Sequence, residues 1–88
     1  MDSFRIEWSR TAGQDVRRLP LAVVRRVVTA VDGLALNPRP RGAQFVEGSE
    51  SLWRIRVGVY RVLYEIGDSN GVILIRYVRH RREAYRNL

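Results

Sequence analysis

The chain begins with a stretch in which apolar and polar residues alternate. Phe4, Ile6 and Trp8 occupy every second position of residues 4–8, and charged residues stand between them. A period of two is typical of a β-strand that buries one of its faces. The alternation therefore predicts a first strand at residues 4–8 in which these three side chains are buried.

Two segments with helical spacing follow this strand. Ser9 is suited to cap a first helix, in which Ala12, Val16 and Leu19 lie on one face. Pro20 suits the first turn of a second helix. The apolar stripe predicted for the second helix consists of Leu21, Val24, Val27, Val28, Val31, Leu34 and Ala35. The short connection predicts an antiparallel helical hairpin, which ends at the second proline of the chain.

The second half of the chain predicts a sheet. Residues 37–51 contain prolines and glycines, which predict a loop with a short extended piece at 44–46. Strands are predicted, without helices between them, at residues 52–57, 60–66 and 72–78. Their short connections favour an antiparallel meander. Residues 81–88 are long enough for about two turns of helix.

The two predicted hairpins bring basic side chains together on one face. A turn at Gly58-Val59 pairs Arg56 with Arg61. A two-residue turn at Asn70-Gly71 places His80 opposite Arg61, whereas a four-residue loop would slide this pairing by two residues and keep the same faces. Like charges that face each other across strands are mildly destabilising. An anion is therefore expected to bind between them.

Neighbouring residues enlarge this basic face. The further basic residues with a predicted role in substrate binding are Arg54, Arg79, Arg81 and Arg82. Tyr85 adds an aromatic ring on which a nucleobase can stack. These residues predict a surface that grips a phosphate backbone. The simpler interpretations are a solvated basic face and a histidine that is structural, at the end of a strand.

Charge and composition narrow the range of functions. The 88 residues contain 16 basic side chains, all of them arginine, and 9 acidic ones, so the net charge of +7 favours a polyanionic partner. The absence of cysteine and the single histidine argue against a metal site. RNA carries its own nucleophile, so its cleavage requires only phosphate stabilisation and proton transfer. With no apolar run that spans a bilayer and no signal-peptide pattern, a cytoplasmic protein without membrane contact is expected.

The longest informative segments resemble one known family. Residues 52–64, followed by residues 77–86, are similar to the RelE/ParE superfamily of bacterial and archaeal toxins, on its RelE side. The opening agrees with this resemblance, through Glu7-Trp8-Ser9, residues 15–20 and Asn37-Pro38. The resemblance extends over nearly the whole chain.

The resemblance implies a fold, an activity and a set of partners. One α+β domain of residues 1–88 is expected, in the order β-α-α-β-β-β with a short C-terminal helix, its two N-terminal helices packed on a twisted antiparallel sheet. RelE-like toxins are endoribonucleases that need no metal or other cofactor. They cleave mRNA in the A site of the 70S ribosome by attack of the 2′-hydroxyl and so inhibit translation. An acidic antitoxin of the RelB or Phd type silences them and supplies the contact with operator DNA.

The resemblance also assigns roles to individual residues. Arg54 and Arg56 fall at the basic strand positions that bind phosphate, and in the type member one of these acts as proton acceptor. Arg61 falls at the position that stabilises the pentacovalent phosphate. Arg81 corresponds to the proposed general acid and Tyr85 to the tyrosine that stacks on the nucleotide.

Two departures from the family affect the proton transfers. An arginine gives up its proton with great reluctance, so Arg56 is a doubtful base, and His80 is hypothesised to take one of the two transfers. Some relatives use a glutamate before the second strand, but Ala43 and Gln44 stand near that place here.

Two rival functions remain open. One is ParE-like inhibition of DNA gyrase without nuclease activity, and the other is a basic binding module with weak catalysis.

Overall fold

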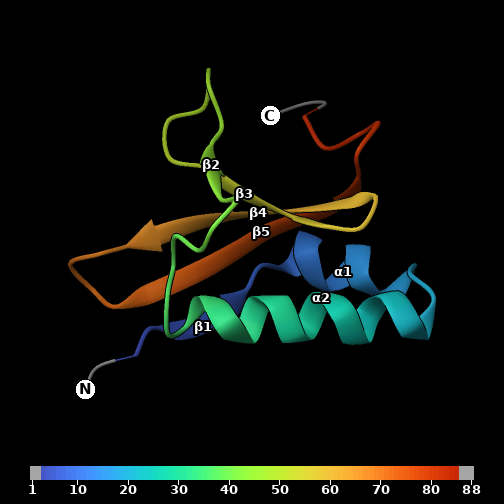
Figure 1. Ribbon diagram of the computed structural model, residues 1–88, viewed down its shortest axis with the longest axis horizontal. Helices are drawn as coiled ribbons and strands as arrows, with labels where there is room; N and C mark the ends of the chain where they lie inside the picture. The colour runs from blue at the N-terminus through green and yellow to red at the C-terminus, as the bar shows by residue number, and fades with distance from the viewer. Residues whose placement is uncertain (1–2, 86–88) are drawn as a thin grey trace.

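The structure is a computed structural model that describes residues 3–85, and its sheet carries both helices on one face. The elements are β1 (Arg5–Trp8), α1 (Arg10–Arg17), α2 (Leu21–Leu34), β2 (Gln44–Phe45), β3 (Trp53–Val57), β4 (Tyr60–Gly67) and β5 (Val72–His80). The strand order across the sheet is β1-β5-β4-β3-β2. Figure 1 shows α1 and α2 below the sheet, while the segment around β2 and the C-terminal segment rise on the other side. The α+β class and the predicted order from the first strand to the last are confirmed, and β2 lies within the extended piece predicted at residues 44–46.

The sheet is mixed, so the prediction of a purely antiparallel sheet is wrong. β3, β4 and β5 form the predicted antiparallel meander, and β2 pairs antiparallel with β3. β1 instead runs parallel to β5. Parallel neighbours need a long crossover connection, and here both helices lie between β1 and the meander. Alternation within β1 carries no information about the strand beside which it lies.

The first helix starts at the predicted cap and also contacts the sheet there. The Ser9 hydroxyl accepts a hydrogen bond from the Ala12 backbone N–H at 3.0 Å and donates one to the Arg76 carbonyl at 2.9 Å. Phe4 and Ile6 pack against the core as expected. Trp8 does not, because it is 37% exposed. Trp8 is the last residue of β1, and the chain turns into α1 two residues later, at Arg10.

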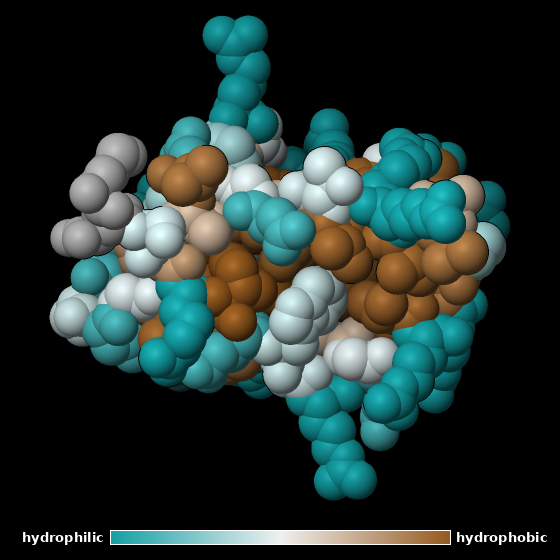
Figure 2. Space-filling view, turned by 90° about the horizontal axis from the view of Figure 1, so that it is seen from below, coloured by the Kyte–Doolittle hydropathy of each residue, from teal (hydrophilic) through white to brown (hydrophobic). Residues whose placement is uncertain are grey.

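Helix α2 buries only part of its apolar stripe. Val27, Val31 and Leu34 are buried, whereas Leu21 and Val28 are exposed. The stripe predicted from the sequence is wider than the surface that β3 and its neighbours can cover. The remainder lies on the outer side of the helical layer, where apolar residues gather between charged ones (Figure 2). Neither helix within residues 3–85 has the length and apolar character required to cross a membrane.

The pairing of β4 with β5 begins as a four-residue loop predicts and then changes. Gly67 pairs with Val72, and this register continues to the pair of Tyr64 with Ile75. The register then shifts, and Arg76 has no Cα partner in β4. Such a β-bulge reverses the faces of all residues beyond it.

The bulge overturns one predicted pair. Arg61 lies opposite Arg79, and His80 lies opposite Tyr60, so the prediction that His80 faces Arg61 is wrong. The pair of Arg56 with Arg61 across β3 and β4 is confirmed. Because Tyr60 belongs to the helix-facing side of β4, the bulge turns His80 towards the helices.

The C-terminal segment forms turns rather than the predicted helix over its described part. Residues 81–85 are turns, and residues 86–88 of the prediction lie outside the described residues. The Arg82 N–H donates to Nδ1 of His80 at 3.2 Å, and the Glu83 N–H donates to the His80 carbonyl at 2.8 Å. These bonds tighten the backbone into turns, because a segment of this length is marginal as a helix. Ala84 fixes the segment by packing with Leu52 and Leu63 on the sheet.

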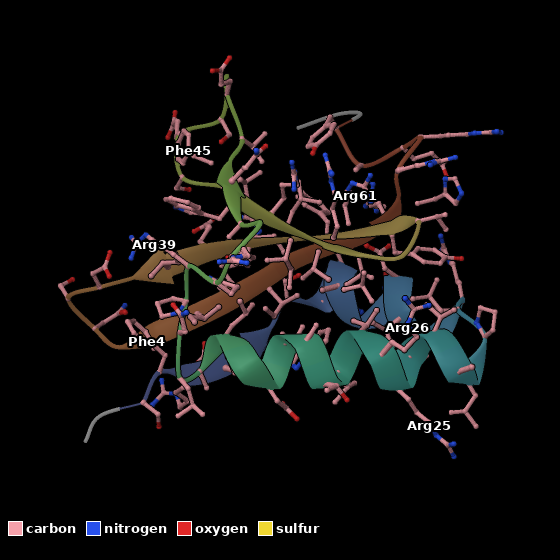
Figure 3. All side chains as sticks on the ribbon, in the orientation of Figure 1. Phe4, Arg25, Arg26, Arg39, Phe45 and Arg61 are labelled. Atoms are coloured by element: carbon pink, nitrogen blue, oxygen red, sulfur yellow. The ribbon has the colours of Figure 1, made fainter. Side chains whose placement is uncertain are left out.

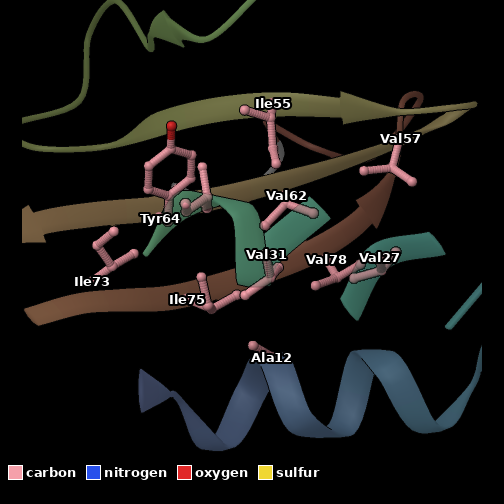
Figure 4. Close-up of a cluster of buried hydrophobic side chains, with 11 residues drawn as sticks. Ala12, Val27, Val31, Ile55, Val57, Val62, Tyr64, Ile73, Ile75 and Val78 are labelled. Carbon is pink, nitrogen blue, oxygen red and sulfur yellow. The ribbon is translucent and has the colours of Figure 1, made fainter. Parts of the chain in front are cut away.

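Tyr64 is the largest fully buried side chain of the core (Figure 4). Its hydroxyl donates to the Pro38 carbonyl at 2.7 Å, and burial raises the pKa of Tyr64 to about 12. The unfolded chain ionises this tyrosine near pH 10, so stability is fully retained below pH 10 and falls as the pH rises to about 12. We expect a loss of about 2–3 kcal/mol over this interval.

Urea unfolding at a series of pH values from neutral to alkaline measures this loss. The Tyr64→Phe variant lacks the ionisable group and should show a shallower decline than the wild type. Tyr85→Phe removes an exposed tyrosine and serves as the control. An equal decline in wild type and Tyr64→Phe would assign the effect to other groups.

Candidate nucleic-acid interface

The alternation of β3 and β4 places arginines on the face of the sheet opposite the helices. Ile55 and Val57 belong to the core. Arg54 and Arg56, which alternate with them along β3, therefore lie on the other face of the sheet. Arg61 on β4 lies on this face too, as Figure 3 shows. The C-terminal turns follow β5 and supply Arg81 and Tyr85. We refer to Arg54, Arg56, Arg61 and Arg81 as the arginine cluster.

Arg61 lies at the electrostatic centre of this cluster. Its pKa is lowered, chiefly by burial and next by the positive charge of Arg56, while Arg54 and Arg81 lower it further. Tyr85 acts in the opposite direction. Several like charges that act on one side chain are stabilised when an anion binds among them. The arrangement is therefore suited to a phosphate group.

Backbone carbonyls hold the guanidinium of Arg61 in place. Its Nη1 donates to the carbonyl oxygens of Gly58 at 3.3 Å and Tyr60 at 3.1 Å. Gly58 has a φ of 60°, which the turn between β3 and β4 requires and which a residue with a side chain rarely adopts. The other N–H groups of the planar guanidinium remain for a phosphate oxygen.

Arg54 is a buried member of the cluster, with 6% exposure. It donates to the Gly42 carbonyl at 3.2 Å and to Oε1 of Gln44 at 2.5 Å. These bonds fasten the loop that carries β2 to the sheet. The structure thus places this predicted substrate-binding residue in the wall of the site, with two of its donors already engaged.

The guanidinium of Arg79 binds to α1 and does not join the predicted basic face. Its Nε donates to Oδ2 of Asp15 at 3.0 Å, and its guanidinium lies 4.8 Å from the ring centre of Tyr77. The same oxygen of Asp15 accepts the backbone N–H of Val78 at 3.0 Å. Asp15 is buried and was not foreseen as functional or structural. Its position three residues after Ala12, on the apolar face of α1, is the signal that could have indicated it.

His80 lies in a different cavity from the arginine cluster. This cavity of about 390 Å³ is also lined by Asp15, Tyr60 and Glu83. The imidazole makes an edge-to-face contact with Tyr60, with a centroid distance of 5.7 Å. The structure therefore brings Arg54, Arg56, Arg61, Arg81 and Tyr85 together but leaves His80 and Arg79 outside. Arg82 is exposed on the C-terminal turns.

A second cavity adjoins the cluster. It has a volume of about 640 Å³ and lies between β2 and the C-terminal turns. Its lining consists of Ala43, Gln44, Phe45, Val46, Glu47, Trp53, Arg54 and Tyr85. Phe45 and Glu47 were missed as cavity residues because strand β2, with two residues, and the loop after it are too short to show a periodic pattern. Within residues 3–85, no group of three or more His, Cys, Asp or Glu side chains could hold a metal ion.

Comparison with known proteins identifies the family. Residues 6–85 match the family model described as "ParE toxin of type II toxin-antitoxin system, parDE". The chain belongs to the RelE/ParE toxin family. The toxin is 32% identical over 84 residues to toxin RelE of Mycobacterium tuberculosis, which covers 94% of this chain and 87% of the relative. It is 30% identical to toxin RelG of the same organism, over 94% of this chain and 97% of the relative.

Solved structures agree with this assignment. The toxin is similar to a chain in the crystal structure of the archaeal RelE–RelB complex from Pyrococcus horikoshii, with a TM-score of 0.80 and 30% identity. The similarity covers 93% of the toxin and 99% of that chain. The mixed sheet with two packed helices is therefore the fold of RelE structures.

Proposed function

We propose that the toxin is an endoribonuclease that cleaves mRNA in the ribosomal A site. The observation that carries the proposal is the pair of Arg56 with Arg61 across β3 and β4, with Arg54 and Arg81 near enough for their charges to act on Arg61, beside the half-exposed ring of Tyr85. Such an arrangement suits a phosphate flanked by a base. The names of the RelE relatives support the same activity.

In the proposed reaction the 2′-oxygen attacks the adjacent phosphorus, and the bond from phosphorus to the 5′-oxygen breaks. A water molecule takes the proton of the 2′-hydroxyl, and Arg81, at the position of the proposed general acid, donates a proton to the 5′-oxygen and regains one from solvent. The products are a 2′,3′-cyclic phosphate and a 5′-hydroxyl. Arg56 and Arg61 stabilise the charge on the pentacovalent phosphate, and Arg81 faces the leaving oxygen. Tyr85 orients the nucleotide by stacking on its base.

The partner that we propose is an acidic antitoxin of the RelB or Phd type. The net charge of +7 favours an acidic chain, and the similar Pyrococcus horikoshii toxin was solved as a complex with RelB. In this proposal the antitoxin supplies the contact with operator DNA, while the toxin contacts mRNA and the 70S ribosome.

Inhibition of DNA gyrase is the second candidate, because the family model that matches the chain is that of ParE toxins. A gyrase inhibitor has no need of arginines that converge on one phosphate. Primer extension on a reporter mRNA in a cell-free translation reaction distinguishes the two functions. Cuts within codons that require ribosomes and disappear in Arg81→Ala would support the ribonuclease. Intact mRNA with arrested cell growth would favour gyrase.

The position of His80 leads to a further prediction. Because its imidazole lies in the cavity with Tyr60 and Glu83, we assign it no proton transfer in the proposed reaction. His80→Gln should therefore cleave the reporter mRNA at a rate within a fewfold of wild type. A general acid or base typically contributes about 100-fold or more. A loss of that size at neutral pH, in a variant that keeps the wild-type melting temperature, would restore the catalytic role of His80.

A further inference from the structure

The cavity beside the arginine cluster has a lining that phosphate binding does not explain. Arg54 and Tyr85 belong both to this cavity and to the surroundings of Arg61. A nucleotide with its phosphate on Arg61 would therefore place its base at the cavity mouth. The volume of about 640 Å³ falls in the range typical of small-ligand sites.

Glu47 is the residue that phosphate binding leaves unexplained. A carboxylate next to a phosphate site weakens phosphate binding by repulsion. Glu47 is exposed, and no ion pair joins it to another residue in the described range 3–85. A carboxylate is well suited, however, to accept hydrogen bonds from the edge of a base. Its chemistry matches a base and not the RNA backbone.

Aromatic side chains in the same cavity offer surfaces for stacking. Phe45 meets Trp53 edge to face, with ring centroids 5.7 Å apart, and the guanidinium of Arg39 lies 5.0 Å from the Trp53 ring centre. These contacts hold the wall formed by β2 and β3. Tyr85 lines the cavity from the C-terminal turns, with about half of its surface exposed. Exposed aromatic rings of this kind stack on unpaired bases.

We propose that this cavity receives the base next to the cleaved phosphate and that Glu47 selects guanine there. The proposal rests on the proposed ribonuclease function. The Watson–Crick edge of guanine presents two adjacent donors, N1–H and the N2 amino group, and one carboxylate accepts both. Adenine and cytosine present one amino donor beside an acceptor, and uracil presents one N–H between two acceptors. Guanine is thus the base with which the Glu47 carboxylate forms two hydrogen bonds.

Glu47→Gln removes this preference. The glutamine amide combines one acceptor with donors, so it forms two hydrogen bonds with any base edge that presents a donor beside an acceptor, and the edges of all four bases do so. The variant should therefore lose the guanine preference of the wild type. That preference should amount to about tenfold or more. Glu50→Gln, an exposed position in the same loop that does not line the cavity, is the matched control.

Cleavage rates on mRNAs that differ only in the base beside each cut provide the first measurement. Wild type and Glu50→Gln should prefer guanine, and Glu47→Gln should cut beside the four bases at similar rates. Equal rates for the four bases in the wild type would overturn the proposal. An unchanged guanine preference in Glu47→Gln would do the same. A uniform loss of cleavage in Glu47→Gln would assign Glu47 to proton transfer and also overturn base selection.

A titration without cleavage separates this proposal from the proposed function. Guanosine and adenosine 5′-monophosphates are added to isotope-labelled toxin, and backbone amide shifts of residues 43–47 are followed by NMR. The wild type should respond to the guanosine nucleotide at lower concentration than to the adenosine nucleotide, and Glu47→Gln should respond to both at similar concentrations. Failure to cut any mRNA would refute the ribonuclease, while this titration would still decide the base selection.

Discussion

Replacement of Arg61 by alanine is expected to slow mRNA cleavage by about 100- to 1000-fold, the loss typical of one donor to a charged transition state. The reason is its position, since the charges of Arg54, Arg56 and Arg81 act on it and two backbone carbonyls fix its guanidinium. Charge develops on the phosphate oxygens as the 2′-oxygen attacks. Without Arg61, only Arg56 would remain of the two arginines that stabilise this charge in the proposed reaction. Single-turnover cleavage of a reporter mRNA on ribosomes measures the rate.

Two further variants show whether the geometry or only the charge of Arg61 is required. Arg61→Lys keeps the charge but loses the planar pair of donors, and its rate should lie between those of wild type and Arg61→Ala. Arg25→Ala removes an arginine from α2, on the opposite side of the molecule (Figure 3), and should cleave at the wild-type rate. An equal loss in Arg25→Ala and Arg61→Ala would mean that net charge alone governs the activity.

Asp15→Ala is expected to lower the free energy of unfolding by about 3 kcal/mol, within the range for removal of one partner from a buried ion pair. The carboxylate accepts from the Val78 N–H and from Arg79, so its loss leaves a buried backbone donor and a partly buried cation without partners. Because these bonds join α1 to the end of β5, the loss should also loosen the start of the C-terminal turns. Urea unfolding at neutral pH measures the change.

Asp32→Ala is the control for this prediction. Asp32 lies exposed on α2, and its replacement should change stability by less than about 0.5 kcal/mol. Asp15→Asn retains an oxygen acceptor but not the charge and should fall between Asp15→Ala and wild type. If Asp15→Ala lost less than about 1 kcal/mol, the bonds at Val78 and Arg79 would contribute little to stability.

The meander shows which structural features local sequence determines. The turn at Gly58 fixes every pair between β3 and β4, including Arg56 with Arg61, because glycine position and alternation agree there. The β4–β5 hairpin has no such agreement, since an Asn-Gly pair fits both a two-residue turn and the four-residue loop. The bulge at Arg76 is seen in the structure, where Ile75 and Val78 are both buried although they lie three positions apart.

The site could be predicted where residues lie on regular strands. Arg56 and Arg61 follow from alternation and the turn at Gly58, whereas for Arg81 and Tyr85 the family resemblance added the expected roles. The roles of Arg79 and Asp15 depend on how α1 lies against β5, which is a tertiary contact without a local pattern. The same reason hid Glu47, because only the fold of residues 42–52 over the sheet brings this loop next to the C-terminal turns.

Because of the bulge in β5, the number of residues in this short segment decides which face of the sheet each later side chain occupies. Ile75 and Val78 face the helices only because Arg76 stands outside the pairing. Loss of Arg76 would straighten the strand and leave both ends facing as they do now. Insertion of one residue after Arg76 would move every later side chain of β5, including His80, to the opposite face of the sheet. In related toxins, an insertion at this position would exchange the side chains on the two faces of the sheet without any substitution.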